Sequence, residues 1–228
     1  MGHNHRVSTV NRTTAAASLS VSFTVGLYGI AFGAAGIAAG FSLLQTCLLS
    51  LLTFSGASQF AVIGVLGAGG SAISGITTAS LLGIRNALYG LRMSPILQLK
   101  GVKKVVGAQV TIDESTGVAL GQSELGIDAM RQGFWLTGIG VYFFWNLFTV
   151  VGALGAQAMG DPAAWGLDAA VPAAFLGLVW PRLTNHFERA LAVTAMVFSL
   201  ALTPFVAAGV PIISTALLAV AFGWKARR

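Results

Sequence analysis

Apolar residues fill long stretches of this chain without interruption by charge. No Asp, Glu, Lys, Arg or His occurs between residues 13 and 84, and two further uncharged stretches cover 132–160 and 190–224. One helix needs about 20 apolar residues to cross the hydrocarbon of a bilayer. The pattern therefore predicts an all-α polytopic membrane protein with about seven spans. The predicted spans lie at 19–39, 44–66, 72–97, 133–157, 167–181, 189–207 and 210–224.

Two of these spans contain residues that weaken a helix. The second span carries Ser55, Gly56 and Ser58, and the fifth carries Pro172, whose ring removes a helical hydrogen bond. An offset of 115 residues superimposes the two interruptions. Three spans in each half would make the second half enter the membrane from the opposite side. We therefore expect an inverted repeat of three-span halves, with broken helices that meet at the midplane.

This organisation divides the chain into five segments. They are a polar N-terminal tail (1–18), a first three-span half (19–97), a polar cytoplasmic connection (98–131), a second three-span half (132–208) and a last span with a basic tail (209–228).

Lysine and arginine are enriched on the cytoplasmic side of membrane spans, and they set the expected orientation. Lys100, Lys103 and Lys104 follow the third span, and the chain ends on a basic tail, so we expect 98–131 and the C-terminus in the cytoplasm. Seven crossings then leave the N-terminus outside. Arg6 and Arg12 argue against that side, and a second span that turned back would reverse it.

Composition supports the membrane assignment and argues against several functions. The mean hydropathy is +0.80 and charged residues make up 9%, against about 25% in soluble domains. The net charge of +6 is not gathered on a polar surface, so we expect no nucleic-acid partner. Cys47 is the one cysteine, and His186 is the one histidine outside the N-terminal tail. We expect no metal site, no cofactor and no enzymatic activity.

Charged and polar side chains inside the predicted spans are the candidates for function. Arg85 lies about halfway along the third span, where a charge must face protein or water. It either binds an anion such as a carboxylate or snorkels to the interface. Asp168 opens the fifth span and either holds a substrate ammonium group or a coupling proton, or caps a helix. Gln59 either binds substrate or packs between helices.

An acidic pair and a row of glycines each allow two interpretations. Asp113 and Glu114 lie in the polar stretch 98–131 and are candidates for a gate or a coupling site, although a solvated loop or amphipathic helix is the simpler interpretation. Small residues let membrane helices approach closely. Gly29, Gly33, Gly36 and Gly40 therefore form a face that either accepts a partner helix or packs within the chain.

Four motifs carry a resemblance to a known family. They are the runs Phe54-Ser55-Gly56-Ala57-Ser58-Gln59-Phe60, Arg85-Asn86-Ala87-Leu88-Tyr89-Gly90, Asp113-Glu114 and Gly166-Leu167-Asp168-Ala169-Ala170-Val171-Pro172-Ala173-Ala174-Phe175-Leu176. In order and spacing the chain resembles the AzlC family, the large subunits of bacterial branched-chain amino acid exporters. One departure is Asn86, which stands where the family commonly has histidine.

The resemblance implies a function, a partner and a location. It implies a secondary transporter in the bacterial plasma (inner) membrane that exports Val, Leu, Ile and often Met, driven by the proton-motive force and working with a small AzlD-type membrane subunit. A non-transporting scaffold, or an accessory subunit of another exporter, is the alternative. The expected substrate-binding residues are Arg85, Asp168, Gln59, Ser55, Gly56, Ser58, Asn86 and Pro172.

Overall fold

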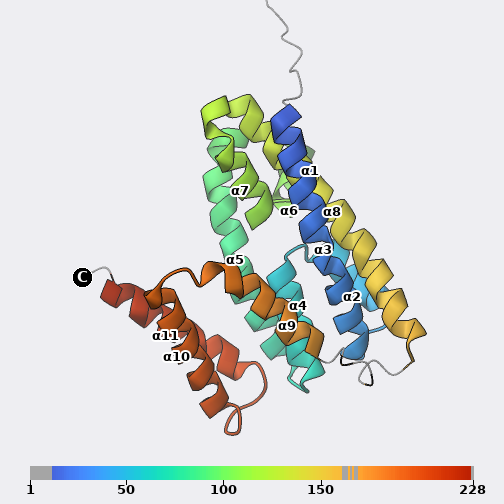
Figure 1. The fold of residues 1–228 in the computed structure, drawn as a ribbon, viewed down its shortest axis with the longest axis vertical. Helices are drawn as coiled ribbons and strands as arrows, with labels where there is room; N and C mark the ends of the chain where they lie inside the picture. The colour runs from blue at the N-terminus through green and yellow to red at the C-terminus, as the bar shows by residue number, and fades with distance from the viewer. Residues whose placement is uncertain (1–11, 161–163, 165, 167–168, 227–228) are drawn as a thin grey trace, which may run out of the picture.

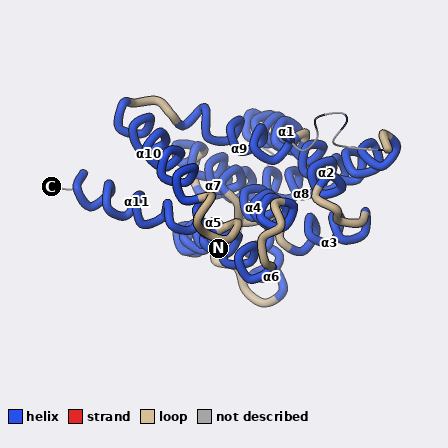
Figure 2. The backbone as a smooth tube through the Cα atoms, turned by 90° about the horizontal axis from the view of Figure 1, so that it is seen from below, coloured by secondary structure: helices blue, strands red, loops and turns tan. Residues whose placement is uncertain are grey.

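The chain is helical throughout the part that the structure describes. The computed structural model describes residues 12–160, 164, 166 and 169–226, and Figure 2 shows no strand among them. The α-helices are α1 (Arg12–Gly26), α2 (Tyr28–Ala38), α3 (Leu43–Leu52), α4 (Gly56–Gly67), α5 (Ala72–Leu97), α6 (Val102–Gln109), α7 (Asp113–Gly121), α8 (Ile127–Ala158), α9 (Ala170–Val179), α10 (His186–Leu202) and α11 (Val210–Ala226). Short 3-10 turns occur at η1 (Ser123–Leu125) and η4 (Trp180–Arg182). The all-α prediction is thus confirmed for these residues.

The longest helical stretches match the longest apolar runs. Arg12–Ala38 and Ile127–Ala158 are long and apolar enough to cross a membrane. Helix α5 has 26 residues, which would reach about 39 Å at the usual helical rise. The other apolar helices are shorter, at 10–17 residues, so length and composition do not establish seven crossings.

Glycine lets α1–α2 lie directly on α8 (Figure 1). Gly33 faces the backbone of Thr149 and Ala153, and a Cβ atom added to it would lie 2.7 Å from the Ala153 nitrogen. The glycine face of the first predicted span is therefore filled from within the chain, and the expectation that it offers an open surface to a partner helix is wrong for Gly33.

The predicted second span does not cross the molecule, because it turns back on itself. Helix α3 begins beside α2, where Thr46 contacts Gly36, and it ends beside Tyr142 of α8. Helix α4 then returns, and Gly67 lies against Ala39 at the end of α2. The predicted break at Ser55 is present, but it is the tip of a helical hairpin.

Side-chain donors satisfy the carbonyl groups that this break exposes. A helix leaves its last four carbonyl groups without partners inside the helix, and in α3 these belong to residues 49–52. Gln59 Nε2 donates to the carbonyls of 49 and 50 at 3.3 and 3.1 Å, and Gln109 Nε2 donates to those of 51 and 52 at 3.0 and 3.5 Å. The Tyr142 hydroxyl adds a bond to the carbonyl of 51 at 3.2 Å. Gln59 is thus a helix cap, with its amide nitrogen directed at α3.

A second reversal of the chain joins α9 to α10. Val171, in the first turn of α9, lies near Gly64 of α4. Further along α9, the ring centroid of Phe175 lies 6.0 Å from that of Phe60. After η4 the chain descends through α10, and Gly209 lies beside Ser74 at the start of α5. Helix α11 runs back along α10. Both reversals place a hairpin tip at the same level of the molecule as the middle of α5.

The direction of the helices does not support the inverted repeat. Ser22 donates to the carbonyl of Thr137 at 3.3 Å, while Gly33 lies against Ala153. Residue numbers thus rise together along α1–α2 and α8, so the two helices run in the same direction. An inverted repeat requires its opening helices to run in opposite directions. The inverted repeat is therefore not confirmed, because the second apolar run turns back inside the molecule.

The same reversal corrects the relative position of the N-terminus. Thr14, in the first turn of α1, lies 2.9 Å from the Gln122 side chain. The start of α1 and the 98–131 stretch are therefore at the same end of the molecule, and not at opposite ends as seven crossings would require.

Candidate functional site

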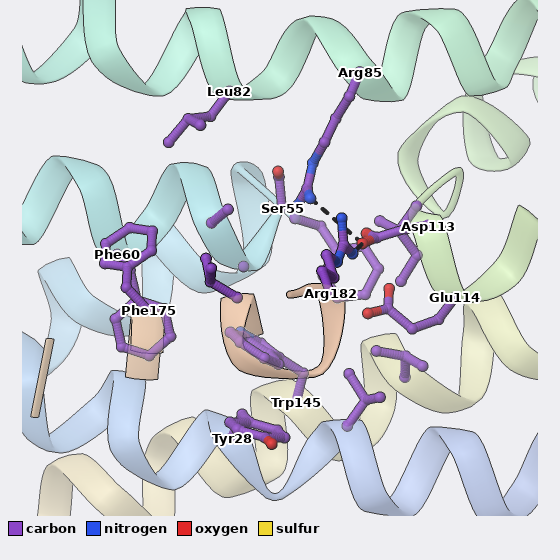
Figure 3. A pocket seen from close by; sticks show the side chains of 17 residues that line it. Tyr28, Ser55, Phe60, Leu82, Arg85, Asp113, Glu114, Trp145, Phe175 and Arg182 are labelled. Carbon is purple, nitrogen blue, oxygen red and sulfur yellow. Dashed lines mark hydrogen bonds and ion pairs between the residues drawn. The ribbon is translucent and has the colours of Figure 1, made fainter. Parts of the chain in front are cut away.

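A cavity of about 210 Å³ lies where the two hairpin tips meet the middle of α5 (Figure 3). Its walls come from α1, α2, α4, α5, α7, α8, α9 and η4, together with the residues that precede α4 and α7. This volume is below the roughly 300–1,000 Å³ of pockets for drug-sized ligands, which restricts the cavity to a small ligand.

One side of the cavity carries four charged side chains that form a connected group. Asp113 Oδ2 lies 3.4 Å from Arg85 Nη1 and 3.0 Å from Arg182 Nη2, so one carboxylate oxygen serves two guanidinium groups. Glu114 follows Asp113 in the wall. We call Arg85, Asp113, Glu114 and Arg182 the charged cluster. It can pair with both ends of a zwitterion.

The start of α7 holds both carboxylates at the cavity. Asp113 and Glu114 occupy the first turn of that helix, where the helix dipole favours negative charge. The Ser115 hydroxyl accepts the Ile112 backbone N–H at 3.0 Å and donates to the carbonyl of Val110 at 2.7 Å, which fixes the turn that enters the helix. Asp113 and Glu114 therefore lie on a helix at the cavity, and the interpretation of this segment as a solvated loop is wrong for α7.

Burial changes the acidity of one of these carboxyl groups. The pKa of Glu114 is raised to about 7, first by removal from water and then by the neighbouring Asp113 carboxylate, while Arg85 acts in the opposite direction. Desolvation and a nearby like charge both disfavour the ionised form of an acid. Both effects therefore favour the protonated form of Glu114.

The opposite side of the cavity is aromatic. Phe60 is fully buried and packs edge-to-face against Trp145, with ring centroids 6.4 Å apart, and Phe54, Phe175 and Tyr28 complete this wall. Trp145 Nε1 is buried without a hydrogen-bond partner. A ligand that fits the whole cavity has a polar, charged end and an apolar end.

The structure brings some of the predicted site residues together and separates others. Ser55 and Gly56 line the cavity beside Arg85. Ser58 is buried behind it and donates to the carbonyl of Ala79 at 2.9 Å. Pro172 lies at a different hollow, between α2, α4 and α9.

The remaining predicted residues do not join this group in the described structure. Asn86 has a buried Oδ1 without a partner, and Gln59 faces α3; neither lines the cavity. Asp168 lies outside the described residues. The predicted pairing of Arg85 with Asp168 therefore remains a prediction, whereas Gln59 does not share the cavity with Arg85. The carboxylate that the structure places beside Arg85 is Asp113.

Arg182 lines the cavity and pairs with Asp113, but the sequence analysis did not include it among the candidate site residues. It directly follows the fifth predicted span, 167–181. That span is short for a full crossing, which was the available sign that its basic end lies within the protein. Among the described residues no three His, Cys, Asp or Glu side chains form a group that could hold a metal ion.

Comparison with known proteins agrees with a membrane protein of this kind. The family model described as AzlC protein matches residues 20–159. The chain is 30% identical over 174 residues to the inner membrane protein YgaZ of Escherichia coli (strain K12), covering 72% of this chain and 69% of that protein. No solved structure matches.

Proposed function

Because the chain belongs to the AzlC family, we propose that it is the large subunit of a secondary transporter that exports Val, Leu, Ile and other apolar amino acids such as Met. It resides in the bacterial plasma (inner) membrane as a multi-pass protein, performs no chemical conversion, works with a small AzlD-type membrane subunit and is driven by the proton-motive force.

The two-ended cavity is the observation that carries this proposal. An apolar amino acid has a carboxylate and an ammonium group at one end and a hydrocarbon side chain at the other. The charged cluster offers two guanidinium groups, of which each can bind two carboxylate oxygens, and two carboxyl groups. Phe54, Phe60 and Phe175 form the apolar end.

The position of the cavity supports transport over passive binding. Substrate sites of secondary transporters are built from interrupted helices, because the interruption frees backbone groups and permits movement. Here two chain reversals, at Ser55 and at η4, meet at one cavity. The alternative, a non-transporting scaffold or accessory subunit, requires no charged side chains inside such a cavity.

Efflux measurements test the proposal. Cells preloaded with a leucine-containing peptide would express the chain with its small partner, and release of radiolabelled leucine would be followed. We expect Arg85→Lys to reduce efflux at least about tenfold, because one ammonium group cannot reproduce a bidentate guanidinium contact.

Arg92→Lys is the matched control, since Arg92 lies on the same helix but is exposed and outside the cavity. It should stay within about twofold of wild type, and both variants should insert and retain the partner. Efflux no higher than in cells that lack the pair would reject transport of leucine and favour the scaffold.

A further inference from the structure

The two carboxyl groups of the charged cluster differ in their surroundings. Asp113 is shared between Arg85 and Arg182. Glu114 forms no ion pair with any residue that the structure describes. Figure 3 shows its carboxyl group directed into the cavity beside Asp113. Glu114 is thus the carboxyl group of the cluster that has no arginine partner.

Charge balance shows what this carboxyl group can accept. The two arginines contribute two positive charges, Asp113 contributes one negative charge, and ionised Glu114 brings the cluster to neutrality. A substrate carboxylate that binds the arginines leaves the Glu114 carboxylate in need of a cation. A buried charge is costly without a partner, and a proton or an ammonium group supplies one.

We propose that the Glu114 carboxylate binds either a proton or the ammonium group of the amino acid, so that the two exclude each other. This inference rests on the proposed function. An amino acid then leaves its ammonium site when Glu114 takes up a proton, and it binds again when that proton is lost. Such exclusion at one side chain couples proton entry to amino acid exit.

The charged and ionisable groups around Glu114 come from several elements. Both arginines remain charged at any working pH. The ionisable side chains that share the cavity with Glu114 are Asp113 on α7, Arg85 on α5, Arg182 on η4 and Tyr28 on α2. Helices α1 and α8 present Val25, Val141 and Trp145. The raised pKa of Glu114, about 7, matches the range in which exchange is useful.

Binding of radiolabelled leucine to the purified protein with its small partner, between pH 5 and pH 8.5, tests the inference. We expect the Kd for leucine to rise about tenfold for each pH unit below pH 7, since one proton competes with one ligand. In weak buffer near pH 6, wild-type protein should release close to one proton for each leucine bound.

Two variants and one analogue sharpen the test. Glu114→Gln should bind leucine more weakly, with a Kd that does not change with pH. Glu124→Gln should keep the wild-type profile, because Glu124 is exposed on η1 and lies outside the cavity. 4-Methylpentanoate, which has the side chain and carboxylate of leucine but no ammonium group, should show no loss of affinity on acidification from pH 8 to pH 6.

The outcomes separate this inference from the proposed function. If wild-type protein neither binds nor exports leucine, the proposed function fails. If leucine binds with a Kd independent of pH, or binds without proton release, the inference is wrong while the proposed function stands. Retention of the wild-type pH profile by Glu114→Gln would also overturn it. Proton release is measured on wild-type protein, so the test does not depend on folding of the variant.

Discussion

Substitution of Gly33 by alanine tests the close packing of α2 on α8. The new methyl carbon would meet the Thr149 carbonyl oxygen and would lie 2.7 Å from the Ala153 nitrogen, whereas ordinary contact begins at 3.4 Å. The helices would therefore have to separate by about 0.7 Å at Ala153 alone (3.4 − 2.7). Both atoms belong to the α8 backbone, which cannot turn aside as a flexible side chain can.

The expected loss follows from two opposing effects. Overpacking of a close contact costs about 1–3 kcal/mol, and rigid backbone neighbours put Gly33→Ala near the upper end. The higher helix propensity of alanine stabilises the folded state by about 1 kcal/mol relative to glycine. The net loss of unfolding free energy is about 2 kcal/mol, which for a chain of this size lowers the melting temperature by about 4–8 °C.

Gly155→Ala provides the control on the facing helix. A Cβ atom at Gly155 meets nothing within 4 Å, so only the helix-propensity gain remains, and the melting temperature should rise by about 2–4 °C. Both variants would be measured in one detergent by loss of the folded peak in size-exclusion chromatography after heating. Equal melting temperatures for the two variants would refute the close α2–α8 contact.

Three further predictions concern other parts of the molecule. Gln109→Leu removes the amide donor to the carbonyls of residues 51 and 52, while Tyr142 still donates to the carbonyl of 51. We expect a loss of about 0.5–1.5 kcal/mol, seen as a lower melting temperature than for Gln98→Leu at the exposed end of α5. Glu114 has a folded pKa of about 7 against an ordinary 4.5, so the folded state binds the extra proton and stability falls as pH rises from 4.5 to 7, by roughly 3 kcal/mol. Glu114→Gln should flatten this part of the melting-temperature profile, and an unchanged slope would contradict the burial of that carboxyl group. In a cysteine-free background, Lys103→Cys should be protected from an impermeant maleimide in intact cells and Gln157→Cys should be labelled; the opposite pattern would reverse the orientation.

Local features of the sequence were enough to locate most helices. The third predicted span, 72–97, coincides with α5, because its apolar run starts after a Gly-Gly-Ser turn and stops before a lysine-rich stretch. The break at Ser55 was also expected, since serine and glycine interrupt the run there. These are properties of neighbouring residues, which the sequence displays directly.

The hydropathy pattern did not indicate whether the chain continues across the molecule or turns back. An apolar run of 23 residues at 44–66 has the length of a crossing, and hydropathy is the same whether the chain continues or turns back. The reversal depends on Gln59, Gln109 and Tyr142, which cap α3 from positions up to 91 residues away. The pairing of Arg85 with Asp113, 28 residues apart, likewise depends on the fold.

The two hairpin tips are fastened to the rest of the protein in different ways, which has a mechanical consequence. Four terminal carbonyls of α3 accept hydrogen bonds from side chains of α4, α6 and α8, so several elements hold the first tip. The η4 tip is tied to α7 through Arg182 and Asp113, and the Arg182 side chain is 64% exposed. Water competes for such a contact, whereas it has little access to the buried Gln59. The Arg182–Asp113 ion pair can therefore open to water while α9 stays packed against α2 and α4.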